Sequence, residues 1–188
     1  MQDWSAMTDE PLKAISLFSG YEGFGLGLKM AGNNLEVLLY VEIDDYATNI
    51  IKARQRDGIL DPGPVHDDIK TLDGRKYRGI VDIIFGGFPC QPHSVAGNRA
   101  GEADERNLWP DFLRCIRDVE PRLVFLENVP GINVSPGDGR PAYGGTVVGQ
   151  LSELGYCVEW DVVSAADAGA PHLRKRWWVA AYSDPDGG

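Results

Sequence analysis

The sequence predicts an α/β fold with a doubly wound, mostly parallel sheet. Short apolar runs alternate with segments whose apolar residues recur at helical spacing, a pattern typical of parallel sheets covered by helices. The mostly apolar run at residues 81–85 is brief, as expected of a strand buried on both faces. Glycine, proline and polar residues separate these elements. A chain of 188 residues fits one such domain.

The elements follow in the order strand, helix, strand, helix. A strand at residues 14–18 enters a helix at 24–31 through a glycine-rich turn, and a strand at 36–41 enters a helix at 45–55. Apolar spacing and chain breakers predict the rest: strands at 81–85, 123–126, 157–164 and 177–181, helices at 108–119 and 146–154, and loops at 57–64 and 130–145. We assign residues 1–13 to an N-terminal tail, 14–182 to the domain, and 183–188 to a polar tail or the start of a linker.

Composition restricts the class of protein. The formal net charge is −10, which taken alone counts against a nucleic-acid-binding surface, because such surfaces are usually basic. Three cysteines without paired spacing argue against a disulfide framework and for a reducing compartment. Three scattered histidines form no metal-ligand pattern with them. Residues 1–13 lack the apolar core of a signal peptide, and no apolar stretch is long enough to span a membrane. We therefore expect a cytoplasmic protein without a metal or a membrane partner.

Glycines and an acid follow the first two predicted strands. In open α/β sheets, ligands bind outside the carboxyl ends of the strands. Residues 17–28, "LFSGYEGFGLGL", let the backbone approach a ligand closely, although their spacing is not that of the dinucleotide fingerprint. Glu42 ends the second strand, where it can accept hydrogen bonds from both hydroxyls of a ribose. The alternatives are a structural turn and a helix N-terminal acid beside Asp44 and Asp45. Together, turn and acid favour a cofactor containing a nucleoside.

A cysteine and a second acid follow two further strands. Cys90 lies just past the strand at 81–85, in "GGFPCQPHSVAG", where loop position and polar neighbours favour a nucleophile over a buried thiol. Cys115 and Cys157 lie on apolar faces and fit core thiols. Glu127 ends the strand at 123–126, and burial would raise its pKa and suit it to donate a proton. It could equally fix a loop. A cysteine nucleophile, a buried acid and a nucleoside cofactor suit attack on an electron-poor ring followed by one-carbon transfer.

In five ordered blocks, the sequence resembles the DNA (cytosine-5)-methyltransferases. "LFSGYEGFGLGL" resembles the family's first S-adenosylmethionine loop, and "VEIDDYA" resembles its ribose-binding strand end. The Pro-Cys-Gln motif lies in "GGFPCQPHSVAG", the Glu-Asn-Val motif in "LENV", and a block like Gln-x-Arg-x-Arg in "HLRKRWWVAA". The resemblance runs from about residue 14 to residue 181 and implies a Rossmann-like methyltransferase fold with S-adenosyl-L-methionine as cofactor.

The resemblance also implies roles for individual residues. Cys90 would be the nucleophile, Glu127 would hold the pyrimidine at N3 and N4, and Arg174 and Arg176 would lie near the base. The residues that would surround the cofactor are Phe18, Ser19, Gly20, Glu22, Gly23, Glu42, Ile43, Asp68, Ile69, Pro89 and Leu108. The residues that would face DNA are Gln91, Ser94, Arg99 and Arg106, although the two arginines also fit a solvated surface.

The chemistry implied is transfer of a methyl group to carbon 5 of cytosine in DNA. Addition of the Cys90 thiolate to carbon 6 would make carbon 5 nucleophilic, and Glu127 would assist at N3. The base would have to leave the duplex to reach such a pocket. The resemblance places the enzyme in a bacterial cell, as a restriction-modification methyltransferase, or in a phage-infected host.

Three departures from the family matter. Ser16 stands where an acid is common before Leu-Phe, and His172 stands where the glutamine is expected. The target-recognition domain and the closing block, which usually follow, are absent from the 188 residues, and much of the expected basic surface would lie there. Alternative interpretations are a half-enzyme whose partner polypeptide recognises DNA, an inactive cofactor-binding remnant, and a nucleotide-binding protein with a structural cysteine. RNA as the substrate also stays open.

Overall fold

The predicted doubly wound α/β sheet is confirmed by a computed structural model, which describes residues 10–89, 107–135 and 142–183. The seven-stranded sheet has the order β3-β2-β1-β4-β5-β7-β6. The strands are β1 (Leu12–Leu17), β2 (Leu35–Val41), β3 (Val65–His66), β4 (Ile83–Gly86), β5 (Leu123–Asn128), β6 (Tyr156–Ser164) and β7 (Lys175–Ser183). The pairs among β1 to β5 are parallel, and β7 runs antiparallel between β5 and β6.

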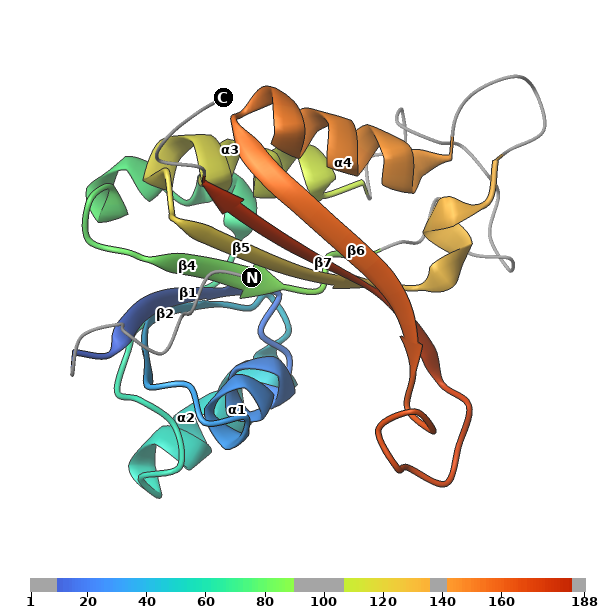
Figure 1. The fold of residues 1–188 in the computed structure, drawn as a ribbon. Helices are drawn as coiled ribbons and strands as arrows, with labels where there is room; N and C mark the ends of the chain where they lie inside the picture. Colours follow the sequence, from blue (N-terminus) through green and yellow to red (C-terminus); the bar gives the residue numbers. More distant parts are fainter. Residues whose placement is uncertain (1–9, 90–106, 136–141, 184–188) are drawn as a thin grey trace.

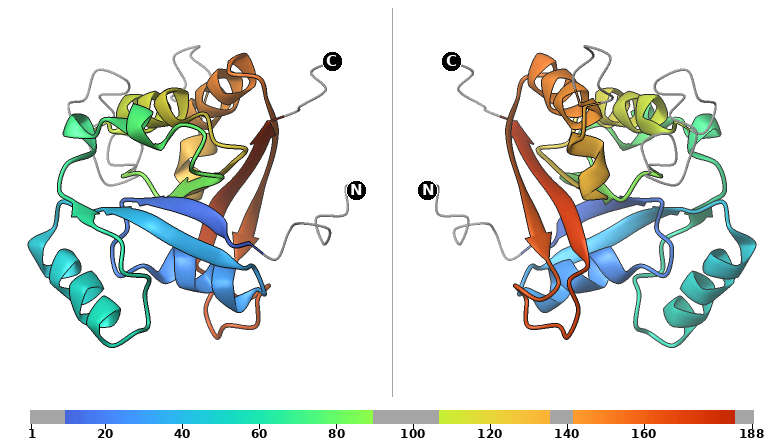
Figure 2. Two further views of the ribbon diagram at one scale, coloured as in Figure 1. Left: turned by 90° about the vertical axis from the view of Figure 1, so that its left-hand side faces the viewer. Right: turned by 90° about the vertical axis from the view of Figure 1, so that its right-hand side faces the viewer.

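Helices cover both faces of the sheet. The helices are α1 (Gly23–Met30), α2 (Asp45–Arg56), α3 (Trp109–Val119) and α4 (Tyr143–Glu153). Figure 1 shows α1 and α2 on one face and α3 and α4 on the other, and the side views of Figure 2 agree. In Figure 1 the hairpin of β6 and β7 extends past the sheet on the side of α1. A pocket lies between α1 and the hairpin, and the candidate site is built around it.

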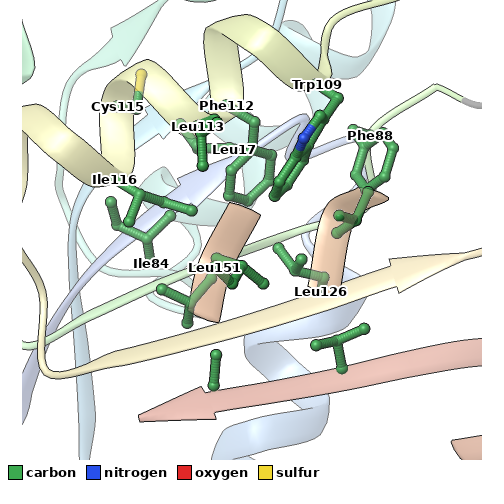
Figure 3. Packing of buried hydrophobic residues seen from close by; sticks show 14 of the residues in the cluster. Leu17, Ile84, Phe88, Trp109, Phe112, Leu113, Cys115, Ile116, Leu126 and Leu151 are labelled. Atoms are coloured by element: carbon green, nitrogen blue, oxygen red, sulfur yellow. The ribbon is translucent and has the colours of Figure 1, made fainter. Parts of the chain in front are cut away.

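Two apolar clusters hold the layers together. The larger one lies between the sheet and the α3–α4 layer, and Figure 3 shows Trp109 and Phe112 packing over Leu17, with Leu126 beside them. The Trp109 ring is buried, and its Nε1 donates to Gln150 Oε1 of α4 at 2.7 Å, so α3 and α4 are joined by a polar contact as well. The smaller cluster joins the sheet to the α1–α2 layer, with Tyr40 and Phe85 at its centre.

Short elements and one helix start differ from the sequence prediction. β3 and the 3₁₀ turns η2 (Ile69–Thr71), η3 (Gly74–Tyr77) and η6 (Pro130–Asn133) were not predicted, because segments this short show no periodicity. Helix α4 begins at Tyr143 rather than residue 146, since Gly144 lies inside it instead of in a loop. A Cβ on Gly144 would stand 2.1 Å from Asn133 Oδ1, so glycine here permits close packing of α4 on η6.

The two cysteines outside the proposed active-site loop have different environments. Cys115 on α3 is 1% exposed, and burial raises the pKa of its thiol to about 12, as expected of a core thiol. The prediction for Cys157 was wrong, because this residue is exposed. It lies on β6, which pairs with β7 alone and alternates poorly between buried and exposed positions. Within the described residues, no helix is long and apolar enough to cross a membrane.

Candidate functional site

The predicted site residues lie at one edge of the sheet. Strands β1, β2, β4 and β5 are parallel neighbours, so their carboxyl ends meet at the same edge. The register places Leu17 of β1 beside Val41 of β2 and Gly86 of β4, and Gly86 beside Leu126 of β5. The glycine turn, Glu42, Pro89 and Glu127 all follow within a few residues of these positions. Parallel pairing therefore brings together groups that lie far apart in the sequence.

The turn after β1 has an unusual backbone. Phe18 and Gly20 have φ angles of 54° and 53°, in the left-handed region that glycine adopts readily and phenylalanine does not. The Phe18 ring stacks on Phe112 of α3 with centroids 6.1 Å apart. The Ser19 hydroxyl donates to Ser16 O at 3.0 Å and accepts from Val41 N at 3.2 Å. These contacts join the turn to both neighbouring strands and to α3.

Glu42 links the turn to the next helix. One carboxylate oxygen accepts from Gly20 N at 2.7 Å, and the other accepts from Asp44 N at 2.8 Å. Asp44 itself caps α2, because its Oδ1 accepts from Ala47 N at 2.7 Å. The role of helix N-terminal acid therefore belongs to Asp44 rather than to Glu42. Each Glu42 oxygen can accept one further hydrogen bond, so the carboxylate can still take a ligand's hydroxyls.

Four other predicted cofactor residues surround the same edge. Ile43 follows Glu42 and is 71% exposed, which leaves its side chain available to a ligand. Asp68 caps η2 through Oδ1, which accepts from Lys70 N at 2.9 Å, and Ile69 is buried in the core. Leu108 is half-buried at the N-terminus of α3. None of the four lines the pocket described below.

Glu127 and Arg176 form an ion pair at the end of β5. In the antiparallel pair of β5 and β7, Glu127 is opposite Trp178, so Arg176 occupies a diagonal position on the same face. Arg176 Nε contacts Glu127 Oε1, and the two side chains are 22% and 26% exposed. Burial raises the pKa of Glu127, although Arg176 and, more weakly, Arg174 oppose the shift. A carboxyl group with a raised pKa can hold a proton and donate it.

Asn128 fixes the chain segment that leads to Cys90. Its side chain is 2% exposed, and its Nδ2 donates to Phe88 O at 3.0 Å. Its Oδ1 accepts from Val129 N at 2.8 Å. The end of β5 thus holds the chain next to Pro89, which is exposed. Sequence reasoning placed Asn128 in a motif but gave it no role. A polar residue at a buried strand end was the signal for one.

A pocket of about 970 Å³ opens between α1, the end of β5 and the hairpin of β6 and β7. This volume is at the upper end of the roughly 300–1,000 Å³ common for ligand pockets. The predicted site residues that line it are Phe18, Ser19, Gly23, Glu127, Arg174 and Arg176. Glu22, predicted to line the cofactor pocket, is 1% exposed and lies outside this lining. The geometry brings the glycine turn and the acid of β5 to one cavity.

The apolar wall of the pocket was missed by sequence reasoning. It contains Phe24 of α1, Phe125 of β5 and Trp178 of β7. The Phe24 ring centroid is 5.1 Å from that of Phe125 and 5.3 Å from that of Trp178. Side chains alternate along a strand, so Phe125 lies on the same face as Glu127, and Trp178 lies opposite Glu127 on that face. Their positions two residues from Glu127 and Arg176 were the signal by which the sequence could have placed them at the site.

Part of the predicted site lies outside the described residues. Cys90 and the predicted DNA-facing residues Gln91, Ser94, Arg99 and Arg106 are in this part of the chain. Their roles stay predictions. In the described ranges, no group of three or more histidine, cysteine, aspartate or glutamate side chains could hold a metal ion.

Comparisons with known proteins agree with this arrangement. Residues 12–186 match the family described as C-5 cytosine-specific DNA methylase. The type II methyltransferase M.NgoMIV of Neisseria gonorrhoeae is 32% identical over 163 residues, which are 87% of this chain and 49% of the relative. The type II methyltransferase M.NaeI of Lentzea aerocolonigenes is 31% identical over 175 residues, which are 93% of this chain and 41% of the relative.

Solved structures show the same fold. The crystal structure of the S. pombe Dnmt2 methyltransferase matches with a TM-score of 0.71 at 21% identity and covers 95% of this chain and 52% of that one. The chain thus spans about half the length of the relatives it matches. The ordered motifs, the sheet topology and the match over residues 12–186 lead to one conclusion: the chain belongs to the C-5 cytosine-specific DNA methylase family.

Proposed function

We propose that this chain carries the catalytic part of a methyltransferase that transfers a methyl group from S-adenosyl-L-methionine to carbon 5 of cytosine in DNA. The observation that carries the proposal is the shared pocket. The glycine turn after β1 and the Glu127–Arg176 pair after β5 line the same cavity, and β4 runs between them toward Cys90. A nucleoside cofactor and a target base could therefore meet beside the cysteine.

The residues present fit S-adenosyl-L-methionine. Glu42 already accepts two backbone N–H groups and retains lone pairs that ribose hydroxyls could use. Ile43 is exposed beside it and offers an apolar surface to the adenine. Phe18, Gly20 and Gly23 would hold the remainder of the cofactor, and Asp68 would accept from the adenine amino group. When bound, the cofactor supplies an electrophilic methyl group on a sulfonium.

Cys90 acts in this proposal as the covalent nucleophile. Its thiolate adds to carbon 6 of cytosine, and Glu127 donates a hydrogen bond or a proton at N3. The ring then has the electron distribution of an enamine, so carbon 5 can accept the methyl group. Loss of the carbon 5 proton and then of the thiolate restores the aromatic ring. The raised pKa of Glu127 supports its part in this sequence.

Arg174 and Arg176 supply positive charge to the same pocket. Positive surroundings lower the pKa of a cysteine and increase its thiolate fraction. The contact of Arg176 with Glu127 also orients the carboxyl toward the cavity. We infer that the two arginines serve both the thiolate and the acid.

DNA is the proposed substrate, and its recognition needs more than the described site. Gln91, Ser94, Arg99 and Arg106 are the proposed DNA contacts in this chain. Because the chain spans about half the length of its relatives, further recognition surface could come from additional sequence or from a second polypeptide. We propose the cytoplasm of a bacterial or phage-infected cell as the place of action.

Covalent trapping tests the proposal. The purified chain is incubated with S-adenosyl-L-methionine and mixed-sequence DNA that contains 5-fluorocytosine, and a denaturation-resistant adduct is sought by mass. Fluorine at carbon 5 cannot leave as a proton does, so a competent enzyme stalls with Cys90 bound to the base. Cys90→Ser should abolish the adduct. Cys157→Ser, which changes an exposed thiol on β6, should leave it intact.

The outcome separates the alternatives. An adduct that depends on Cys90 supports a working catalytic domain. Cofactor binding without an adduct would favour the half-enzyme, and adding the polypeptide encoded next to the gene should then restore trapping. If the chain neither binds the cofactor nor forms an adduct, the proposal is contradicted and an inactive member of the family is favoured.

A further inference from the structure

Glu22 is buried beneath the turn that follows β1. Its backbone has φ 57° and ψ 38°, a left-handed conformation that is unfavourable for a non-glycine residue. Phe18, four residues earlier, also has a positive φ. Two non-glycine residues in this region of one short turn need contacts that hold them there.

The Glu22 carboxyl makes such contacts from below. The Ser16 hydroxyl of β1 donates to Glu22 Oε2 at 2.6 Å, and both residues are 1% exposed. On the other side, a Cβ added to Gly25 of α1 would stand 2.1 Å from Glu22 Oε1. The same Cβ would be 3.0 Å from the Phe85 ring of β4. Serine at 16 and glycine at 25 thus provide a partner and a space for this one carboxyl group.

The backbone of Glu22 joins the turn to helix α1. Its N–H donates to Ser19 O at 2.7 Å, and its carbonyl accepts from Leu26 N at 3.3 Å. Glu42 holds the neighbouring Gly20 from the outer side. The turn is therefore fixed between two carboxyl groups, one exposed to the ligand side and one buried under it.

We propose that Glu22 is a positioning residue for the cofactor, which acts through Ser16 to hold the turn in its binding conformation without touching the ligand. This inference rests on the proposed cofactor site. Ser16 directly precedes the Leu17-Phe18 pair that leads into the turn, and its hydroxyl donates to the Glu22 carboxyl.

The test measures binding of S-adenosyl-L-homocysteine by titration calorimetry, with circular dichroism to verify folding. Glu22→Ala and Ser16→Ala should each weaken binding by roughly tenfold, since each removes a buried hydrogen bond that holds the turn. The double alanine variant should bind no worse than either single variant. Glu22→Gln should stay within about threefold of the unchanged chain, because its amide oxygen can still accept from Ser16.

A reciprocal exchange provides the sharper test. Ser16→Asp alone places two carboxyl groups against each other, and Glu22→Gly alone removes the acid. The double variant Ser16→Asp/Glu22→Gly restores a single carboxyl group and gives glycine the left-handed position, so it should bind better than either single variant. General destabilisation of the turn would not produce this recovery.

The outcomes distinguish the inference from the proposed function. If the unchanged chain binds and the alanine variants bind equally well, the positioning role is wrong and the proposed cofactor site stands. If the alanine variants unfold, failure of both Glu22→Gln and the reciprocal exchange to recover binding overturns the role. If the unchanged chain does not bind S-adenosyl-L-homocysteine at all, the proposed function and the inference fail together.

Discussion

Replacing Glu22 by glutamine should change how the stability of the fold depends on pH. Burial raises the pKa of the Glu22 carboxyl from 4.5 to about 7, although Ser16, the Gly25 N–H and Lys29 oppose the shift. Asp61 raises it further, and burial together with the Glu22 charge raises the pKa of Tyr40. Because the folded-state pKa is the higher one, the folded chain keeps a proton that the unfolded chain releases between these values. Stability should therefore fall as pH rises through this window.

The size of the effect follows from the shift. Each pKa unit corresponds to about 1.4 kcal/mol, so the shift amounts to about 3 kcal/mol, most of which is expressed between pH 5 and pH 8. Glutamine cannot ionise. The free energy of unfolding of the unchanged chain, minus that of Glu22→Gln, should thus decrease by about this amount over the same range. Urea unfolding at several pH values measures this difference in free energy. The contributions of most other titrating groups cancel, because both chains contain them.

A control with the opposite sign strengthens the measurement. The hydrogen bond from Arg75 holds the pKa of the half-buried Asp73 carboxyl below its usual range, so any stability contributed by Asp73 is present at neutral pH and lost in acid. The loss in unfolding free energy that Asp73→Asn causes should accordingly become smaller as pH falls. A difference for Glu22→Gln that stays constant, or that grows with pH, would contradict a raised pKa for Glu22. It would mean that the carboxylate is hydrated or paired as an anion in the folded chain.

Three further substitutions test the contacts that shape the site. Arg114→Ala removes the donor to Ile69 O at 2.5 Å and to Leu72 O at 2.7 Å. It should lower the free energy of unfolding in urea by about 1–3 kcal/mol and weaken cofactor binding. The control Arg117→Ala, on the exposed side of α3, should have neither effect. Asn128→Ala removes the hydrogen bond to Phe88 O and frees the segment before Cys90. Adduct formation should become roughly tenfold slower, while cofactor affinity changes little. Equal losses in adduct formation and in cofactor affinity would argue against a positioning role for Asn128. Trp109→Phe loses the hydrogen bond to Gln150 and some volume and should cost about 1–3 kcal/mol, whereas an unchanged unfolding midpoint would show that α3 and α4 do not depend on it.

Local sequence patterns were enough for most of the fold. The strands expected at 36–41 and 157–164 and the helices expected at 45–55 and 108–119 agree with β2, β6, α2 and α3 to within one residue at either end. These elements have clear apolar periodicity and marked ends, such as Pro121 after α3. The two-residue β3 and the start of α4 at Tyr143 were not predictable, because both depend on partners elsewhere in the chain.

Motifs in the linear sequence were enough to indicate the chemistry that we propose. The order of the glycine turn, Glu42, Cys90, Glu127 and the arginine block is visible in the linear chain. The first four follow predicted strands, and the arginine block leads into one. Packing between distant segments sets how these groups meet and which of them face the pocket. Arg176 reaches Glu127 because β7 runs antiparallel beside β5, and Glu22 turns inward because Ser16 and Gly25 receive its carboxyl group. Strand direction and buried hydrogen bonds are properties of packing between distant segments, so no local pattern encodes them.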